Sequence, residues 1–273
     1  MPLDTAYVIC LSMNTHPFSI SPNPANLYVT PGIAATMHKV RFVIENRQGL
    51  TCIMGDVGMG KSSILRMLYG EYAAREDMVT SFIPTPSFVS DFAFLKGICQ
   101  DFGLRPRRSL YDQEQEIRGF LAQKFGENIN VVIFIDEAQR LKGPQLEMVR
   151  TMLNFETNQH KLVQIVLAAQ MELRDKLKDP SKKALRSRII APSILAPLSP
   201  SETRSMIEFR CQTAAISIPF PDEVIQRIYT AANGVPREVL KICAVSFELM
   251  KAMGERNVSL ELLEDAVGEA VVA

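Results

Sequence analysis

The residues best suited to carry out chemistry lie in one glycine-rich stretch, Gly55-Asp56-Val57-Gly58-Met59-Gly60-Lys61-Ser62. It matches the pattern G-x-x-x-x-G-K-[ST], in which a loop holds the phosphates of a nucleoside triphosphate. The glycines let backbone N–H groups converge on anionic oxygens, and Lys61 supplies positive charge to the β- and γ-phosphates. The Ser62 hydroxyl can complete the coordination shell of a Mg²⁺ ion. We therefore expect this loop, with Ser63 after it, to bind ATP and Mg²⁺.

The flanking segments support this interpretation over a chance glycine-rich turn. Leu50 to Met54 is an apolar run typical of a buried strand, and residues 62–72 have the pattern of a helix. A helix that begins at the end of such a loop points its N-terminus at the phosphates.

A second candidate motif is the pair of carboxylates Asp136 and Glu137. They follow Val131 to Ile135, five apolar residues that predict a parallel strand buried on both faces. Asp136 would hold Mg²⁺ through water, and Glu137 would polarise the attacking water. Either acid alone could cap a helix, but the pair after such a strand favours catalysis.

Two further segments carry polar side chains that could reach a bound nucleotide. Gln170 follows the apolar run 162–168, where it could contact the γ-phosphate or the attacking water, or cap the next helix. Arg186 and Arg188 lie in a basic segment farther along. One of these arginines, with Arg188 preferred, could reach the nucleotide of a neighbouring subunit; a solvated charged loop is the alternative.

Composition limits the class of protein. The 273 residues hold 30 Lys plus Arg and 30 Asp plus Glu, so the net charge is zero and a broadly basic surface is excluded. The five cysteines are scattered and form no C-x-x-C pair, which favours a reduced, cytoplasmic protein without a structural metal. No run of 18 apolar residues is present, so we expect no membrane span.

The densest positive cluster is Arg105-Pro106-Arg107-Arg108, after a predicted helix over 90–102. Such a run is often only a solvated loop. Because no acidic partner stands close by in the sequence, we also consider Arg105, Arg107 and Arg108 as contacts to a DNA backbone.

The chain divides into three parts by pattern. Residues 1–32 include a proline-rich stretch, predicted to be extended, whose Phe18, Ile20, Leu27 and Tyr28 could cover a nucleotide base or simply anchor the N-terminus. Residues 33–198 contain the strands and both motifs. Residues 199–273 are predicted to be helical, beginning at a capping box Ser199-Pro200-Ser201-Glu202.

Within this last part, the stretch Gly234-Val235-Pro236-Arg237 stands at a predicted helix start. Arg237 there could swing over the phosphates, so that the position of the helical part would depend on the nucleotide state.

Together these motifs resemble the AAA+ ATPases, most closely the branch that includes the secretion protein ExeA and the transposition regulators TnsC and TniB. The resemblance rests on the N-terminal Pro17-Phe18-Ser19-Ile20, on residues 55–62 and 135–139, and on Gln170, Arg188 and residues 234–237. It implies an α/β P-loop fold with a five-stranded parallel sheet and a small helical lid. It further implies ATP bound between subunits of a ring or filament, with Arg188 acting in trans.

Three functions fit this resemblance. The first is an ATP-dependent regulator of DNA transposition that oligomerises on double-stranded DNA and links target-selector proteins to a transposase. The second is an ExeA-like secretion ATPase, which would normally continue into a membrane span that this sequence lacks. The third is a nucleotide-dependent scaffold or switch, which would not need Glu137.

Overall fold

The structure is a computed structural model that describes residues 16–272, in two compact units. One unit comprises Pro22–Ala196; the other joins residues 16–21 to the segment from Pro197 onward. The predicted boundaries at 32 and 198 differ from this division chiefly at the N-terminus, where residues 16–21 pack with the helical part. Among residues 16–272 no helix is both long and apolar enough to cross a bilayer.

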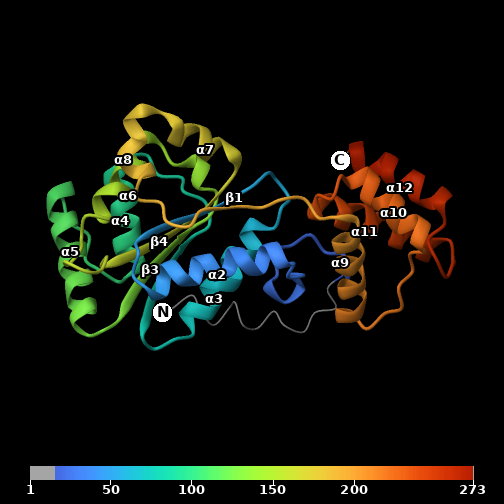
Figure 1. Cartoon of the computed structure of the whole chain (residues 1–273), viewed down its shortest axis with the longest axis horizontal. Helices are drawn as coiled ribbons and strands as arrows, with labels where there is room; N and C mark the ends of the chain where they lie inside the picture. Colours follow the sequence, from blue (N-terminus) through green and yellow to red (C-terminus); the bar gives the residue numbers. More distant parts are fainter. Residues whose placement is uncertain (1–15, 273) are drawn as a thin grey trace. The chain divides into compact units, whose positions relative to one another are not determined.

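The larger unit is built on a five-stranded parallel sheet, as the resemblance implied (Figure 1). Its order is β2-β3-β4-β1-β5, with strands β1 Leu50–Met54, β2 Met78–Ile83, β3 Asn130–Ile135, β4 Val163–Ala169 and β5 Ser193–Ile194. The three central strands are buried along their whole length, which is why they read as continuous apolar runs. Edge strand β5 has only two residues, too few to give such a run, and sequence analysis missed it.

The two helices predicted in this unit, over 62–72 and 90–102, are present as α3 and α4 with bounds that differ by one residue at each end. The helices of this unit are η1 Pro24–Asn26, α2 Pro31–Glu45, α3 Lys61–Ala73, α4 Asp91–Asp101, α5 Leu110–Gly126, η2 Ala138–Arg140, α6 Gly143–Met152, α7 Met171–Lys178, η3 Pro180–Lys182 and α8 Lys183–Arg186. Helix α2 begins at Pro31, because Thr30 caps it and a proline is favoured at the first helical position. The short turn η1 interrupts the stretch expected to be fully extended.

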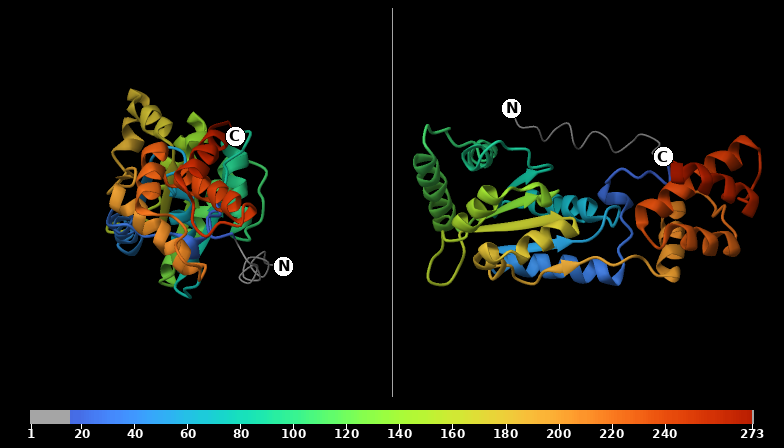
Figure 2. Two further views of the ribbon diagram at one scale, coloured as in Figure 1. Left: turned by 90° about the vertical axis from the view of Figure 1, so that its right-hand side faces the viewer. Right: turned by 90° about the horizontal axis from the view of Figure 1, so that it is seen from above.

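Alternate residues of each strand face opposite layers of helices. Phe134 contacts the rings of Tyr69 and Tyr72 from α3, on the face that α2 and α3 cover. Ile133 and Ile135 belong instead to a core shared with α4, α5, α6 and α7. The two layers lie on opposite sides of the strands (Figure 2).

The second unit contains α9 Pro200–Thr213, α10 Asp222–Ala232, α11 Pro236–Ala252 and α12 Leu260–Val272. The predicted capping box is confirmed: the Ser199 hydroxyl accepts from Glu202 N, and the Glu202 carboxylate accepts from Ser199 N at 2.9 Å.

Phe18 belongs to the core of this helical unit. Its side chain is fully buried, and its ring lies 5.4 Å from that of Phe220 and 5.6 Å from that of Phe247. The buried guanidinium of Arg210 donates to the Pro17 carbonyl at 3.2 Å. Of the two alternatives for Phe18, anchoring the N-terminal segment is therefore the one observed.

Candidate nucleotide-binding site

The glycine-rich loop joins the carboxyl end of β1 to the first turn of α3. Gly58 and Gly60 adopt φ values of 83° and 88°, a left-handed conformation that favours glycine. At Gly55 a Cβ would come within 3.2 Å of the Leu195 side chain, so the loop passes close to the chain after β5. Lys61 is buried and its Nζ donates to the carbonyls of Gly55 and Asp56 at 2.8 and 2.7 Å. The loop thus has the geometry expected of a phosphate cradle.

Asp136 lies against the start of α3. It is only 4% exposed, and its carboxylate accepts from the Ser62 hydroxyl and, at 2.9 Å, from Glu137 N. Burial raises the pKa of Asp136, and these two hydrogen bonds offset part of that rise. A buried carboxylate beside a hydroxyl, next to a phosphate cradle, is a donor set that suits Mg²⁺. Mg²⁺ bound here would neutralise phosphate charge.

Glu137 and Gln170 meet at the same edge of the sheet, because β3 and β4 run parallel in register, with Ile135 opposite Leu167. Gln170 Nε2 lies 3.4 Å from Glu137 Oε2. Glu137 itself adopts a left-handed backbone conformation (φ 51°), which turns the chain sharply after the strand. The structure therefore brings together the loop, the acid pair and Gln170, residues that are far apart in the sequence.

One residue of this cluster was not assigned a role from the sequence. Gln139 donates from Nε2 to Glu137 Oε2 at 2.5 Å, and its Oε1 accepts from Gln170 N at 3.0 Å. A glutamine two residues after the acid pair was the available signal. The two hydrogen bonds of Gln139 depend on the turn at Glu137 and on the position of β4, and the spacing of residues in the sequence predicts neither.

Arg188 lies at the opposite end of β1 from the glycine-rich loop. The next residue, Ile189, bridges to Leu50, the first residue of the strand, and Ile190 N donates to the Leu50 carbonyl at 2.7 Å. Five strand residues at roughly 3.3 Å each separate that end from the loop. The Arg188 guanidinium donates to Asn154 Oδ1 at 2.8 Å and to the Ala184 carbonyl at 3.1 Å. Arg188 is therefore not part of this site within the chain.

The alternative finger, Arg186, is the last residue of α8, and its guanidinium donates to the Leu177 carbonyl at 3.3 Å. Arg237 lies in the helical unit, as the second residue of α11, and its side chain is exposed. Its predicted action on the phosphates stays a prediction.

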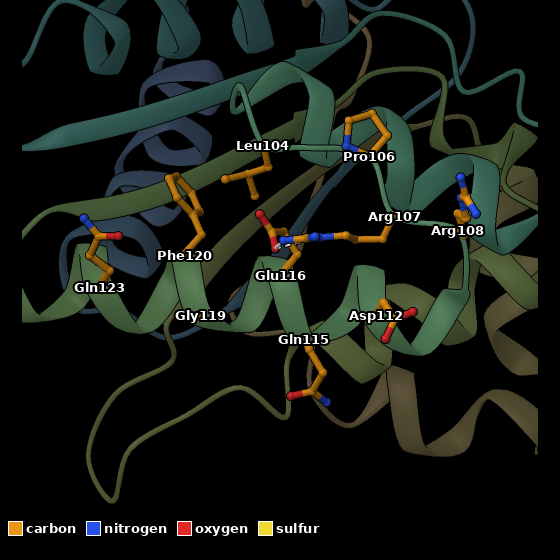
Figure 3. A pocket seen from close by; sticks show the side chains of 10 residues that line it. All are labelled: Leu104, Pro106, Arg107, Arg108, Asp112, Gln115, Glu116, Gly119, Phe120 and Gln123. Atoms are coloured by element: carbon orange, nitrogen blue, oxygen red, sulfur yellow. Dashed lines mark hydrogen bonds and ion pairs between the residues drawn. The ribbon is translucent and has the colours of Figure 1, made fainter.

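The basic loop is not free of acids, contrary to the expectation from the sequence. Arg107 forms a two-pronged ion pair with Glu116 on α5, with Nη2 to Oε2 at 2.5 Å (Figure 3). Glu116 stands two turns into α5, so only the fold brings it against the loop. Arg105 and Arg108 are exposed, and no residue in the described part of the chain forms an ion pair with either.

Comparison with known proteins gives matches over most of the chain. Residues 44–177 match the family described as AAA domain. The General secretion pathway protein A of Aeromonas hydrophila is 30% identical over 245 residues, which make up 87% of this chain and 43% of that protein. The chain thus spans less than half the length of this relative.

Several solved structures share the fold. The ORC2 protein of Aeropyrum pernix, in ADPNP–ADP complexes, superposes with a TM-score of 0.70 at 17% identity, over 93% of this chain and 71% of that one. For CDC6P of Pyrobaculum aerophilum the TM-score is 0.68 at 17% identity, covering 93% and 70%. For the A. pernix ORC1 protein in complex with DNA it is 0.67 at 14% identity, covering 95% and 71%. At such identities the similarity concerns the fold alone.

Proposed function

We propose that this chain, of which residues 44–177 match the family described as AAA domain, is a P-loop ATPase that works as an assembly of copies on duplex DNA. In this proposal the assembly is a regulator of DNA transposition that links target-selector proteins to a transposase. The observation that carries the ATPase part is the cluster at the carboxyl edge of the sheet. There Ser62 and Asp136 are hydrogen-bonded, and Glu137 lies beside them with Gln170 on its carboxylate.

Each residue of the cluster has a distinct role in this proposal. Backbone N–H groups of the loop and the Lys61 ammonium bind the phosphates, while Ser62 and Asp136 hold Mg²⁺. The Glu137 carboxylate accepts a proton from the attacking water and orients it, and Gln170 contacts the same water or the γ-phosphate.

The location of Arg188 supports self-assembly. A catalytic arginine stabilises the charge that develops on the transferred phosphoryl group, so it must reach the phosphates. Arg188 lies at the far end of β1 from the loop of its own subunit. In this proposal it therefore serves the nucleotide of the adjacent copy, in a ring or a filament.

The DNA part of the proposal rests on Arg105 and Arg108, two exposed cations in one short loop. Phosphate contacts need positive charge that is not already neutralised, and the charge of Arg107 is already paired with Glu116. A structural neighbour of this chain, ORC1, is seen in complex with DNA, which makes duplex DNA a rational ligand to test.

A second candidate is an ATPase associated with secretion, and a specific observation favours it. The A. hydrophila relative, at 30% identity, is a general secretion pathway protein. The third candidate is a scaffold that binds nucleotide without hydrolysis. It does not explain why Gln139 and Gln170 contact the carboxylate of Glu137.

Duplex binding followed by fluorescence anisotropy across a salt series, with a non-hydrolysable ATP analogue, separates the first two candidates. We expect the Arg105→Ala/Arg108→Ala double variant to lose affinity and to reduce the log–log salt slope by about two. The matched Arg107→Ala variant, in the same loop, should have a much smaller effect because its charge is already paired. An unchanged slope in the double variant would remove this loop from the DNA site. Absence of binding by the parent protein with any nucleotide would favour the secretion candidate.

A further inference from the structure

The carboxylate of Glu137 accepts a hydrogen bond from Gln139, and the Gln139 side chain also contacts the end of the neighbouring strand β4. Gln139 donates to Glu137 Oε2 at 2.5 Å, and the other end of the same amide accepts from Gln170 N at 3.0 Å. The first contact joins two residues of one turn. The second joins that turn to the end of β4, 31 residues away in sequence.

The orientation of the Gln139 amide follows from its two partners. A backbone N–H can only donate, so the atom facing Gln170 N must be the carbonyl oxygen. The atom facing the carboxylate of Glu137 must then be the NH₂ group, which is what a carboxylate requires. Both ends of the amide demand the same orientation, so a flipped amide would lose both hydrogen bonds at once.

The turn that carries Gln139 is itself fixed to α7. Lys176 Nζ donates to the backbone carbonyl of Gln139 and, at 3.3 Å, to that of Leu141. Helix α7 begins directly after Gln170. Hydrogen bonds thus join the turn after β3 to the helix after β4, and the Gln139 side chain links this turn to Glu137.

We propose that Gln139 is a positioning residue for ATP hydrolysis, which binds one oxygen of Glu137 and leaves the other to face the attacking water. Oxygen Oε2 receives Gln139 and, more distantly, Gln170. No donor from the part of the chain that the structure describes lies within hydrogen-bond distance of Oε1. This inference rests on the proposed role of Glu137 as the base.

Two substitutions separate positioning from a merely structural role. Gln139→Met keeps the length of the side chain but removes both hydrogen-bonding ends. Gln139→Glu keeps an acceptor for Gln170 N but turns a carboxylate toward Glu137 in place of a donor. If Gln139 only ties the turn to β4, Gln139→Glu retains that tie and hydrolyses ATP like the parent. If it positions Glu137, Gln139→Glu is at least as slow as Gln139→Met, because two carboxylates now repel.

We would measure kcat and KM for ATP, the single-turnover hydrolysis rate, and the affinity for a fluorescent ATP analogue, in the full chain. For both variants we expect kcat to fall roughly 10- to 100-fold, as misplacement of a catalytic group does, with KM and nucleotide affinity within about two-fold of the parent. The matched control is Gln226→Glu, the same change on the exposed face of α10. It should leave all these values unchanged.

The outcomes separate this inference from the proposed function. Parent-like kcat in Gln139→Glu, together with loss of turnover in Glu137→Gln, would overturn the role of Gln139 and leave Glu137 as the base. Parent-like turnover in Glu137→Gln would overturn the proposed function itself. A loss of nucleotide affinity equal to the loss of kcat would show that Gln139 acts on binding, which also contradicts the inference.

Discussion

At the scale of single residues, the site contains the buried carboxylate of Asp136, and the neighbouring groups offset only part of the free-energy cost of burying its charge. Asp136 has lost most of its contact with water, and the Ser62 hydroxyl, one backbone N–H and the charge of Arg66 offset part of that loss. An ionised carboxylate in such surroundings costs stability until a cation arrives. The same burial that favours Mg²⁺ therefore destabilises the protein without it.

This gives a stability prediction with a defined sign. Because the folded-state pKa of Asp136 is raised, the folded protein binds more protons than the unfolded chain between the two pKa values. Stability therefore falls as the pH rises from the ordinary pKa of aspartate through the raised one, and the cost is complete above the raised pKa. Asp136→Asn should raise Tm in EDTA at pH 7, by about 2–4 °C for each kcal/mol relieved, and should abolish stabilisation by Mg²⁺-ATP.

Differential scanning calorimetry with and without Mg²⁺-ATP checks this sign. Asp175→Asn is the matched control, because Lys178 lowers the pKa of that exposed carboxyl. It should not raise Tm. A Tm for Asp136→Asn below that of the parent in EDTA would contradict the electrostatic account of the site.

The carboxylate of Glu137 carries the chemical step in this account. Glu137→Gln keeps the contacts to Mg²⁺ and phosphates but removes the base, so ATP binding should persist while turnover falls by about 10²-fold or more. Phosphate release and binding of a fluorescent ATP analogue measure the two quantities in the same preparation. Turnover within a few-fold of the parent would mean that Glu137 is not the base.

At the scale of elements, the helical unit depends on a backbone contact at Gly234. Its φ is +70°, and a Cβ there would lie 2.2 Å from the Leu198 carbonyl oxygen. In the opposite direction, Leu198 N donates to the Gly234 carbonyl at 2.8 Å. The segment before α9 and the turn before α11 thus touch backbone to backbone, and only glycine fits between them.

A matched pair of glycines isolates this contact. Gly254 has nearly the same φ, +71°, but a Cβ there would meet nothing within 4 Å. Gly254→Ala should cost about 1–2 kcal/mol through backbone strain alone. Gly234→Ala adds a collision with backbone and should cost about 3–5 kcal/mol. Urea unfolding followed by circular dichroism measures both, and equal costs would show that the contact with Leu198 is not a constraint.

The elements show which features the sequence could predict. Strands β1, β3 and β4 were predicted because burial on both faces demands continuous apolar runs, and the capping box at Ser199 was predicted because its residue types are nearly diagnostic. The ion pair between Arg107 and Glu116 was not predicted, because it depends on how the loop folds back on α5. The hydrogen bond between Gln139 and Gln170 was also not predicted, because it forms only where β3 and β4 end side by side.

At the scale of the whole molecule, we propose that one chain holds an incomplete site. The phosphate loop, the acid pair and Gln170 gather at the carboxyl edge of the sheet, whereas Arg188 sits beside the first residue of β1. A neighbouring copy that placed its Arg188 at this edge would complete the site. Hydrolysis should then depend on protein concentration, and each active site should belong to two chains.

The most direct test of this account mixes two inactive variants. Glu137→Gln subunits lack the base but keep Arg188, and Arg188→Ala subunits keep the base but lack the arginine. A mixed interface can unite an intact Glu137 with an intact Arg188 from its neighbour. We expect the equimolar mixture to hydrolyse ATP at a substantial fraction of the parent rate, while each variant alone stays near background and binds ATP normally. A mixture no more active than its components would contradict a site shared between copies.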